Sequence, residues 1–179
     1  MNPAPTESEL TRENVSLIEI VEYRPEHHEA FLRLNRTWLE EHDLLEPADL
    51  AMLEDPEGEI LADGGQIFIA LRGGQVVGSC AAIRLSTETI ELAKLAVDPT
   101  ARGSGLGRRL CEAVVEFSRR AGATAIELSS NHALVPAIRL YESMGFVHEA
   151  APDDPRYVSA DVYMRLSLDS GTGADTLRP

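Results

Sequence analysis

The chain has 179 residues, of which 44% are hydrophobic, a size and composition typical of one globular domain rather than of a disordered segment. Its formal net charge of −14 argues against nucleic acid as a partner and would attract a cationic one. No apolar run approaches the roughly 20 residues that a bilayer-spanning helix needs, so we expect no membrane partner.

Polar tails, which we predict to be flexible, flank a single domain at residues 15–168; the tails are residues 1–14 and 169–179. Within the domain, segments with hydrophobic periods of two and of 3.6 residues are separated by Pro and Gly breaks. They predict strands at 16–23, 65–72, 75–85, 87–97, 124–130, 146–150 and 160–168. They predict helices at 25–42, 47–53, 106–121 and 136–145. This order predicts an α/β fold with a mixed sheet and helices against its faces.

The stretch 101–110, with the sequence ARGSGLGRRL, places three glycines at alternate positions just before an expected helix. It is not a dinucleotide fingerprint, because Arg108 stands where the third glycine would fall, and it lacks the Gly-Lys-Ser/Thr of a triphosphate loop. We expect this stretch to bind a diphosphate, because a helix start offers unpaired N–H groups and the positive end of the helix dipole. Three arginines, Arg102, Arg108 and Arg109, add positive charge and hydrogen-bond donors. An ordinary flexible connection is the alternative interpretation.

Three segments in this order resemble the acyl-CoA-binding core of the GNAT superfamily of N-acetyltransferases: ELAKLAVDP, RGSGLG and NHALVPAIRLYESMGF. The resemblance implies a mixed, mostly antiparallel sheet of about seven strands with about four helices, in which the parallel strands 87–97 and 124–130 splay apart. It also implies acetyl-CoA as the cosubstrate, held in the wedge between these two strands. The residues implied to bind it are Leu95, Ala96, Val97, Arg102, Gly103, Ser104, Gly105, Leu106, Gly107, Arg108 and Asn131.

Acetyl transfer to an amine needs a base and an acid. A lysine-like amine has a pKa of about 10.4 and must lose a proton before it attacks, and the departing thiolate must gain one. The resemblance implies Tyr141 as the acid and Glu91 as the base, the latter directly or through water, with a backbone N–H near Ala96 as donor to the thioester oxygen. The alternatives are that Tyr141 only packs its helix or contacts the cofactor, and that Glu91 is solvated or steers the amine by charge.

Alternation along the strand at 87–97 adds a geometric expectation. With a period of two, Glu91 shares a face with Ala93, Leu95 and Val97. Lys94 then faces away from Glu91, and we expect it to have a structural role, reaching a carboxylate or the solvent.

We therefore expect an N-acetyltransferase in which the amine of a small molecule or a protein attacks acetyl-CoA directly in a ternary complex. The second hypothesis is a catalytically silent acyl-CoA-binding sensor or interaction module, against which the presence of Tyr141 argues. Arg156 and Tyr157, between the last two strands, are candidates for contact with the acceptor or a partner protein.

Histidines and cysteines complete the sequence-based expectations. The histidines lack the spacing of metal ligands, so we expect no metal. Cys80 and Cys111 are isolated, and the first residues lack the pattern of a secretory signal, which together indicate the cytoplasm. Because proteins of this superfamily often pair, we expect a homodimer.

Overall fold

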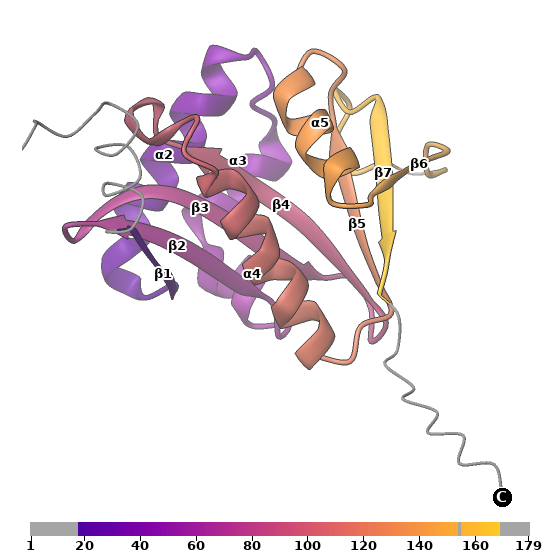
Figure 1. The fold of residues 1–179 in the computed structure, drawn as a ribbon, viewed down its shortest axis with the longest axis horizontal. Helices are drawn as coiled ribbons and strands as arrows, with labels where there is room; N and C mark the ends of the chain where they lie inside the picture. Colours follow the sequence, from indigo (N-terminus) through magenta and orange to yellow (C-terminus); the bar gives the residue numbers. More distant parts are fainter. Residues whose placement is uncertain (1–17, 154, 169–179) are drawn as a thin grey trace, which may run out of the picture.

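The structure is a computed structural model that describes residues 18–153 and 155–168; the tails predicted at 1–14 and 169–179 lie outside these ranges. Seven strands form one sheet in the order β1-β2-β3-β4-β5-β7-β6 (Figure 1). The strands are β1 (Ile18–Glu22), β2 (Gln66–Arg72), β3 (Gln75–Arg84), β4 (Thr89–Val97), β5 (Ala125–Ser130), β6 (Val147–Glu149) and β7 (Val162–Ser167). Only the pair β4–β5 among these is parallel, so the predicted α/β fold with a mostly antiparallel sheet is confirmed.

Helices occur where the 3.6-residue period predicts them. The α-helices are α2 (His28–Glu41), α3 (Pro47–Glu54), α4 (Leu106–Arg120) and α5 (Val135–Ser143), and short helical turns span Pro25–His27, Glu57–Leu61 and Pro99–Ala101. The turn Glu57–Leu61, which follows Pro56, lies between the predicted elements at 47–53 and 65–72, where no helix was expected. None of the helices in the described ranges is long and apolar enough to cross a membrane.

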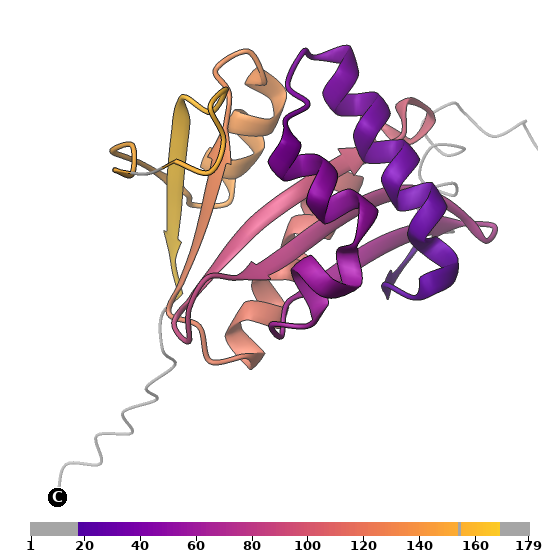
Figure 2. The same ribbon diagram turned by 180° about the vertical axis from the view of Figure 1, so that it is seen from behind.

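The helices cover the two faces of the sheet unequally. The helices α4 and α5 lie on one face (Figure 1), and α2 and α3 lie on the other, over β2–β4 (Figure 2). Each face has its own hydrophobic core. Leu106, Leu110, Val114, Ile90 and Ile126 belong to the core under α4, and Phe31, Leu53, Ile67 and Ile69 to the core under α2 and α3.

The parallel strands β4 and β5 stay together over only a short distance. They pair where Thr89–Glu91 meets Ala125–Glu127, and then diverge (Figure 1). Beyond Glu91, the edge of β4 that faces β5 therefore has no strand partner within the described ranges. This divergence provides the space for the site described below.

A β-bulge in β4 overturns the geometric expectation for that strand. Lys94 has a φ of 53°, and β4 has one residue more than β3 between the pairs Ser79–Ala96 and Ala81–Ala93. An extra residue shifts the alternation of side chains by one.

As a result, the side chains before and after the bulge lie on different faces. Ala93 packs on the core under α2 and α3, whereas Leu95 and Val97 pack on the core under α4. The predictions that Glu91 shares a face with Leu95 and Val97, and that Lys94 faces away from Glu91, are therefore wrong.

Candidate functional site

A cavity of about 120 Å³ lies where β4 and β5 diverge, and both sheet strands and three helices line it. It brings together four of the predicted catalytic and cofactor-binding residues: Glu91, Leu95, Asn131 and Tyr141. Lys94 and Tyr157, which the sequence also singled out, line it as well. Within residues 18–153 and 155–168, no three His, Cys, Asp or Glu side chains gather as a metal site would require.

Tyr141 reaches the cavity from α5, where it belongs to the core under α4. Its ring lies 5.8 Å from the ring of Phe146, centroid to centroid. Burial raises the pKa of the Tyr141 hydroxyl well above its usual range, and the neighbouring thiols of Cys111 and Cys80 raise it further. The hydroxyl is therefore protonated at neutral pH, as a proton donor must be.

Glu91 lines the same cavity from β4, and only 8% of its side chain is exposed. Its Oε2 atom accepts a hydrogen bond of 2.7 Å from Nη1 of Arg156. Burial raises the pKa of Glu91, and it outweighs the lowering effects of Arg156 and Lys94 on that pKa. A raised pKa makes this carboxylate a stronger base than an exposed glutamate.

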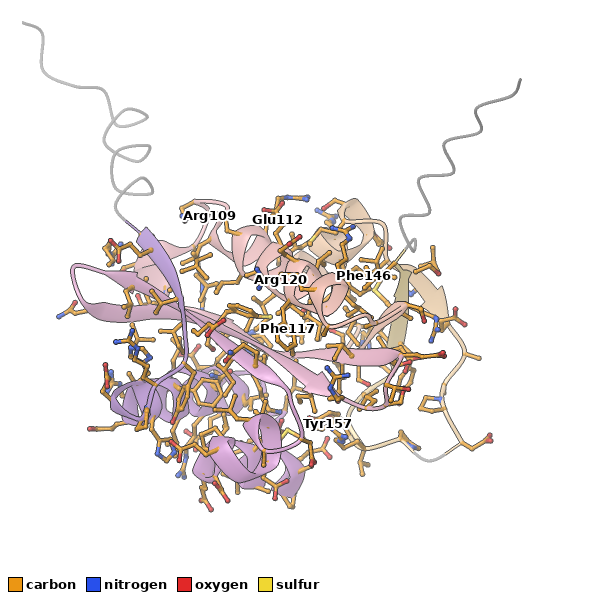
Figure 3. All side chains as sticks on the ribbon, turned by 90° about the horizontal axis from the view of Figure 1, so that it is seen from below. Arg109, Glu112, Phe117, Arg120, Phe146 and Tyr157 are labelled. Carbon is orange, nitrogen blue, oxygen red and sulfur yellow. The ribbon has the colours of Figure 1, made fainter. Side chains whose placement is uncertain are left out.

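Lys94 forms a second buried ion pair beside Glu91. Its Nζ atom lies 2.5 Å from Oδ1 of Asp49 and 3.1 Å from the hydroxyl of Tyr157, and each member of the ion pair has a side chain only 5% exposed. Burial lowers the pKa of Lys94, but Tyr157 and Asp49 together outweigh it and raise the pKa. Lys94 thus reaches a carboxylate, one of the two alternatives expected for it. Its second partner, Tyr157, lies on the side of the sheet opposite Phe117 of α4 (Figure 3).

The connection between β6 and β7 closes the cavity and is held from two directions. Glu46, just before α3, accepts hydrogen bonds from the backbone N–H groups of Val158 and Ser159 at 2.9 and 2.8 Å and from the Ser159 hydroxyl at 2.5 Å. From the end of β5, Nδ2 of Asn131 donates to the Ser159 carbonyl at 2.7 Å. Asn131 therefore positions this connection, and its Oδ1 accepts from the N–H of Ala133 at 2.9 Å.

The glycine stretch lies outside the cavity, at the start of α4. Gly103 and Gly105 have φ values of 73° and 79°, and a Cβ added at either would meet no atom within 4 Å. Gly105 is the N-cap of α4 and provides no side-chain hydrogen bond. The first N–H groups of α4 are thus left uncapped by a side chain, as an anion-binding helix start requires.

Only part of the predicted arginine cluster belongs to this loop. The Nε atom of Arg102 donates to the Val97 carbonyl at 3.1 Å, and Nη2 of Arg108 donates to the Ser143 hydroxyl at 2.5 Å. Arg109, in contrast, is drawn toward β1, where it donates to the Ile18 carbonyl at 2.9 Å.

The other predicted cofactor-binding residues of the glycine loop and of β4 have few side-chain groups that a ligand could contact. Leu106 and Ala96 are each 1% exposed, so they can offer a ligand only backbone groups. The Ser104 hydroxyl donates to the Ala101 carbonyl at 2.6 Å. A Cβ at Gly107 would lie 3.4 Å from Leu140 of α5, so this glycine permits the close approach of α4 and α5.

The partners in the two ion pairs at the cavity were not predicted, although a carboxylate was one of the two alternatives expected for Lys94. Asp49 occupies the third position of a predicted helix, where an acidic residue is typical of a helix start, and it does accept a hydrogen bond of 3.0 Å from the N–H of Glu46. Nothing in the local pattern shows that it also binds Lys94, 45 residues away. Arg156 was expected to contact an acceptor or a partner, and its pairing with Glu91 was not foreseen.

Comparison with known proteins agrees with this architecture. The family model described as "Acetyltransferase (GNAT) family" matches residues 20–146. The N-acetyltransferase YvbK of Bacillus subtilis is 25% identical over 120 residues, which cover 64% of this chain and 77% of that protein. Several other curated relatives are matched over only 30% to 54% of their own length.

Solved structures share the fold. A GNAT acetyltransferase from Staphylococcus aureus Mu50 has a TM-score of 0.78 at 23% identity, covering 85% of this chain and 99% of that one. The structure of yncA from Salmonella typhimurium with its cofactor acetyl-CoA has a TM-score of 0.69 at 21% identity, covering 89% and 99%. With a family match over most of the domain and the same sheet and helices around a divergent strand pair, the chain belongs to the GNAT family of acetyltransferases.

Proposed function

We propose that the protein transfers the acetyl group of acetyl-CoA to a primary amine, which attacks directly while both substrates are bound. The observation that carries the proposal is that a buried carboxylate, Glu91, and a buried phenol, Tyr141, line one cavity where β4 and β5 diverge. Membership of the family supports acetyl transfer, and the acetyl-CoA in the yncA structure supports the choice of cosubstrate.

The residues around the divergent strands fit acetyl-CoA. When bound, it supplies an acetyl group activated as a thioester. The uncapped N–H groups at the start of α4, with Arg102 and Arg108, would hold its pyrophosphate, because Gly103 and Gly105 present no side chain there. The unpaired edge of β4 at Leu95, Ala96 and Val97 would hydrogen-bond its amide-containing arm like an added strand, and Asn131 would face the same arm.

The two titratable residues divide the proton transfers between them. Glu91 accepts the proton that the attacking ammonium must lose, directly or through one water molecule, and its raised pKa suits that task. Tyr141 is protonated and donates to the departing sulfur. The backbone N–H groups around Ala96 on the edge of β4 are the donors to the thioester oxygen.

The names of the relatives point to different acceptors. Among them are an N-acetylaspartate synthetase, an IAA acetyltransferase and a mycothiol acetyltransferase. We therefore keep the acceptor class as a primary amine of a small molecule or a protein, and we keep a cytoplasmic homodimer as part of the proposal.

The test combines acetyl-CoA titration with thiol release on a panel of primary amines, for the wild type and Tyr141→Phe. We expect the variant to retain its affinity for acetyl-CoA and to lose about 10²- to 10⁴-fold in turnover, the usual contribution of a positioned acid. An equal loss of affinity and turnover would mean that Tyr141 mainly binds. If acetyl-CoA binds and no amine is acetylated, the silent binding module replaces the enzyme.

A further inference from the structure

Beside Glu91, one face of the sheet is open. The helices α2 and α3 cover β2–β4 and leave β5 and β7 uncovered on that side (Figure 2). A hollow of about 580 Å³ lies over these strands, and Glu91 lines both this hollow and the cavity between β4 and β5. The charged residues that line the hollow are Glu91, Glu127, Glu149, Arg156 and Arg165.

The two arginines of the hollow differ in what holds them. Arg165 pairs with Glu127, its neighbour across β5 and β7, and both side chains of this ion pair are half-buried. Arg156 pairs with Glu91, whose side chain is 8% exposed, while 37% of the Arg156 side chain is exposed. In the described part of the chain, this is the only hydrogen bond recorded for Arg156, so the other N–H donors of its guanidinium group can bind a ligand in the hollow.

An amine that approaches Glu91 as an ammonium ion competes with Arg156 for the same carboxylate. A simple amine would satisfy Glu91 and leave the guanidinium group without its partner, which is costly in a partly buried site. An amine that carries a carboxylate on the adjacent carbon avoids this cost. Its ammonium group pairs with Glu91, its carboxylate pairs with Arg156, and every charge keeps a partner.

We propose that the acceptor is an amino acid-like zwitterion, whose carboxylate binds Arg156 from the hollow while its amine lies at Glu91. This inference rests on the proposed acetyl transfer and names the substrate class for it. Arg156 is then the residue that determines specificity, because a guanidinium group binds a carboxylate through two parallel hydrogen bonds.

The reaction balances with the groups already described. Glu91 first receives one proton from the ammonium group, and a bond then forms between the amine nitrogen and the acetyl carbon. The carbon–sulfur bond breaks as Tyr141 supplies a proton to the sulfur, and the second proton that the nitrogen loses restores the Tyr141 hydroxyl. The carboxylate of the acceptor is unchanged. The amide product no longer carries a positive charge, so once Glu91 has lost the acquired proton to the solvent, its carboxylate again attracts Arg156, which favours release of the product.

The test compares each of the common L-amino acids with its carboxamide, which keeps the amine and the side chain and lacks the carboxylate. Thiol release is measured at saturating acetyl-CoA. In the wild type we expect at least one amino acid to exceed its carboxamide in kcat/KM by about 10- to 100-fold, mainly through KM, as expected for a hydrogen-bonded charge pair.

Variants of the two arginines show which of them causes the preference for an amino acid over its carboxamide. Arg156→Gln should abolish the preference when both acceptors are compared at a pH above the acidic limb of the variant's profile. Arg156→Lys should restore the preference in part, because it keeps the charge and loses the paired donors. The matched control is Arg165→Gln, which removes the other arginine of the hollow and should leave the preference unchanged. Unchanged acetyl-CoA affinity in each variant shows that it is folded.

Three results would overturn the inference in different ways. If carboxamides are acetylated as well as the amino acids, or if the preference survives in Arg156→Gln, the inference is wrong and acetyl transfer to amines still stands. If acetyl-CoA binds and neither series is acetylated while another amine of the panel is, the inference alone is wrong. If no amine of the panel is acetylated either, the proposed function fails, and the inference fails with it.

Discussion

At the scale of single residues, the site depends on how buried charges are compensated. Glu91 lies near two cations, Arg156 from the β6–β7 connection and Lys94 from its own strand, and burial still raises its pKa. Lys94 in turn stays charged at neutral pH because Asp49 and Tyr157 face it. Each partner therefore controls the protonation or the stability of its neighbour, and each can be removed separately.

The pH dependence of turnover reports on Glu91. Among the neighbouring charges, Arg156 lowers the pKa of Glu91 most, so Arg156→Gln should raise this pKa further. The other influences on the pKa of Glu91 remain in the variant: Lys94 lowers it, and Glu127 and Asp49 raise it. Since the ionised carboxylate is the base, the acidic limb of the kcat/KM profile should move to higher pH. The measurement is a pH–rate profile on a carboxamide acceptor. An unmoved limb in Arg156→Gln would exclude Glu91 as the titrating base.

The buried ion pair of Lys94 and Asp49 should dominate local stability. Lys94→Met leaves the Asp49 carboxylate buried without its partner and should cost about 3–5 kcal/mol in the free energy of unfolding, measured in urea. The double variant with Asp49→Leu should recover most of this loss. The control is Arg36→Met, which breaks the exposed pair with Glu40 and should cost at most about 1 kcal/mol.

The sign of the pH effect on this pair follows from the pKa of Lys94. That pKa is raised in the folded state, so the stability it contributes is fully present below its ordinary value of 10.5. The contribution is lost as the pH rises through the folded-state pKa. Urea denaturation of the wild type and Lys94→Met at neutral and strongly alkaline pH should show the difference between them shrinking.

At the scale of elements, β4 and the start of α4 form the surface to which we propose that acetyl-CoA binds. The bulge at Lys94 turns the strand so that Leu95 and Val97 pack under α4, and the glycines that follow bring the backbone to the surface at the helix start. The positive φ of Gly105 serves this purpose, since other residues rarely adopt it.

Two substitutions at Gly105 separate backbone strain from anion binding. Gly105→Ala and Gly105→Glu should each cost about 1 kcal/mol in stability, because of the φ of 79°. Only Gly105→Glu should also lower acetyl-CoA affinity by more than about tenfold, because it places a carboxylate beside the pyrophosphate. Calorimetric titration measures the affinity.

The matched control lies at the other end of the same helix. Gly122 has a φ of 77° and equally free space around it, so Gly122→Glu carries the same backbone strain without facing the ligand. If Gly122→Glu and Gly105→Glu weakened acetyl-CoA binding equally, the glycine loop would not be the pyrophosphate site.

At the scale of the whole molecule, the cavity is closed by segments far apart in the chain. The start of α3, the bulge of β4 and the end of β5 all hold the connection between β6 and β7, through Glu46, Lys94 and Asn131. Through these contacts Tyr157, Ser159 and Ala160 line one side of the cavity, and Glu91 and Ser129 line both the cavity and the hollow over β5 and β7.

Loosening this connection should affect the acceptor more than acetyl-CoA. Glu46→Ala removes the acceptor of three hydrogen bonds from Val158 and Ser159. We expect the amide hydrogens of Val158 and Ser159 to exchange at least about tenfold faster, and KM for the amine to rise while that for acetyl-CoA stays the same. Glu59→Ala, at an exposed site, is the control. Unchanged exchange at both amides would contradict the proposed closure.

The sequence by itself determined the order of the elements and the identity of the family. Periods of two and 3.6 residues placed every described strand and α-helix within a few residues. Gly73 and Gly74, with φ values of 58° and 80°, make the turn between the strands predicted at 65–72 and 75–85. The glycine loop was recognisable because its spacing before a helix is a local property. These features depend on neighbours in the chain, which the sequence displays directly.

Only the tertiary structure decided how the site is charged and closed. A period of two cannot reveal the bulge at Lys94, because the extra residue is defined only by the pairing with β3. The bonds from Arg156 to Glu91 and from Lys94 to Asp49 join residues 65 and 45 positions apart. Such pairs form because folding buries these charges together. A local sequence pattern cannot show which distant residues will pair.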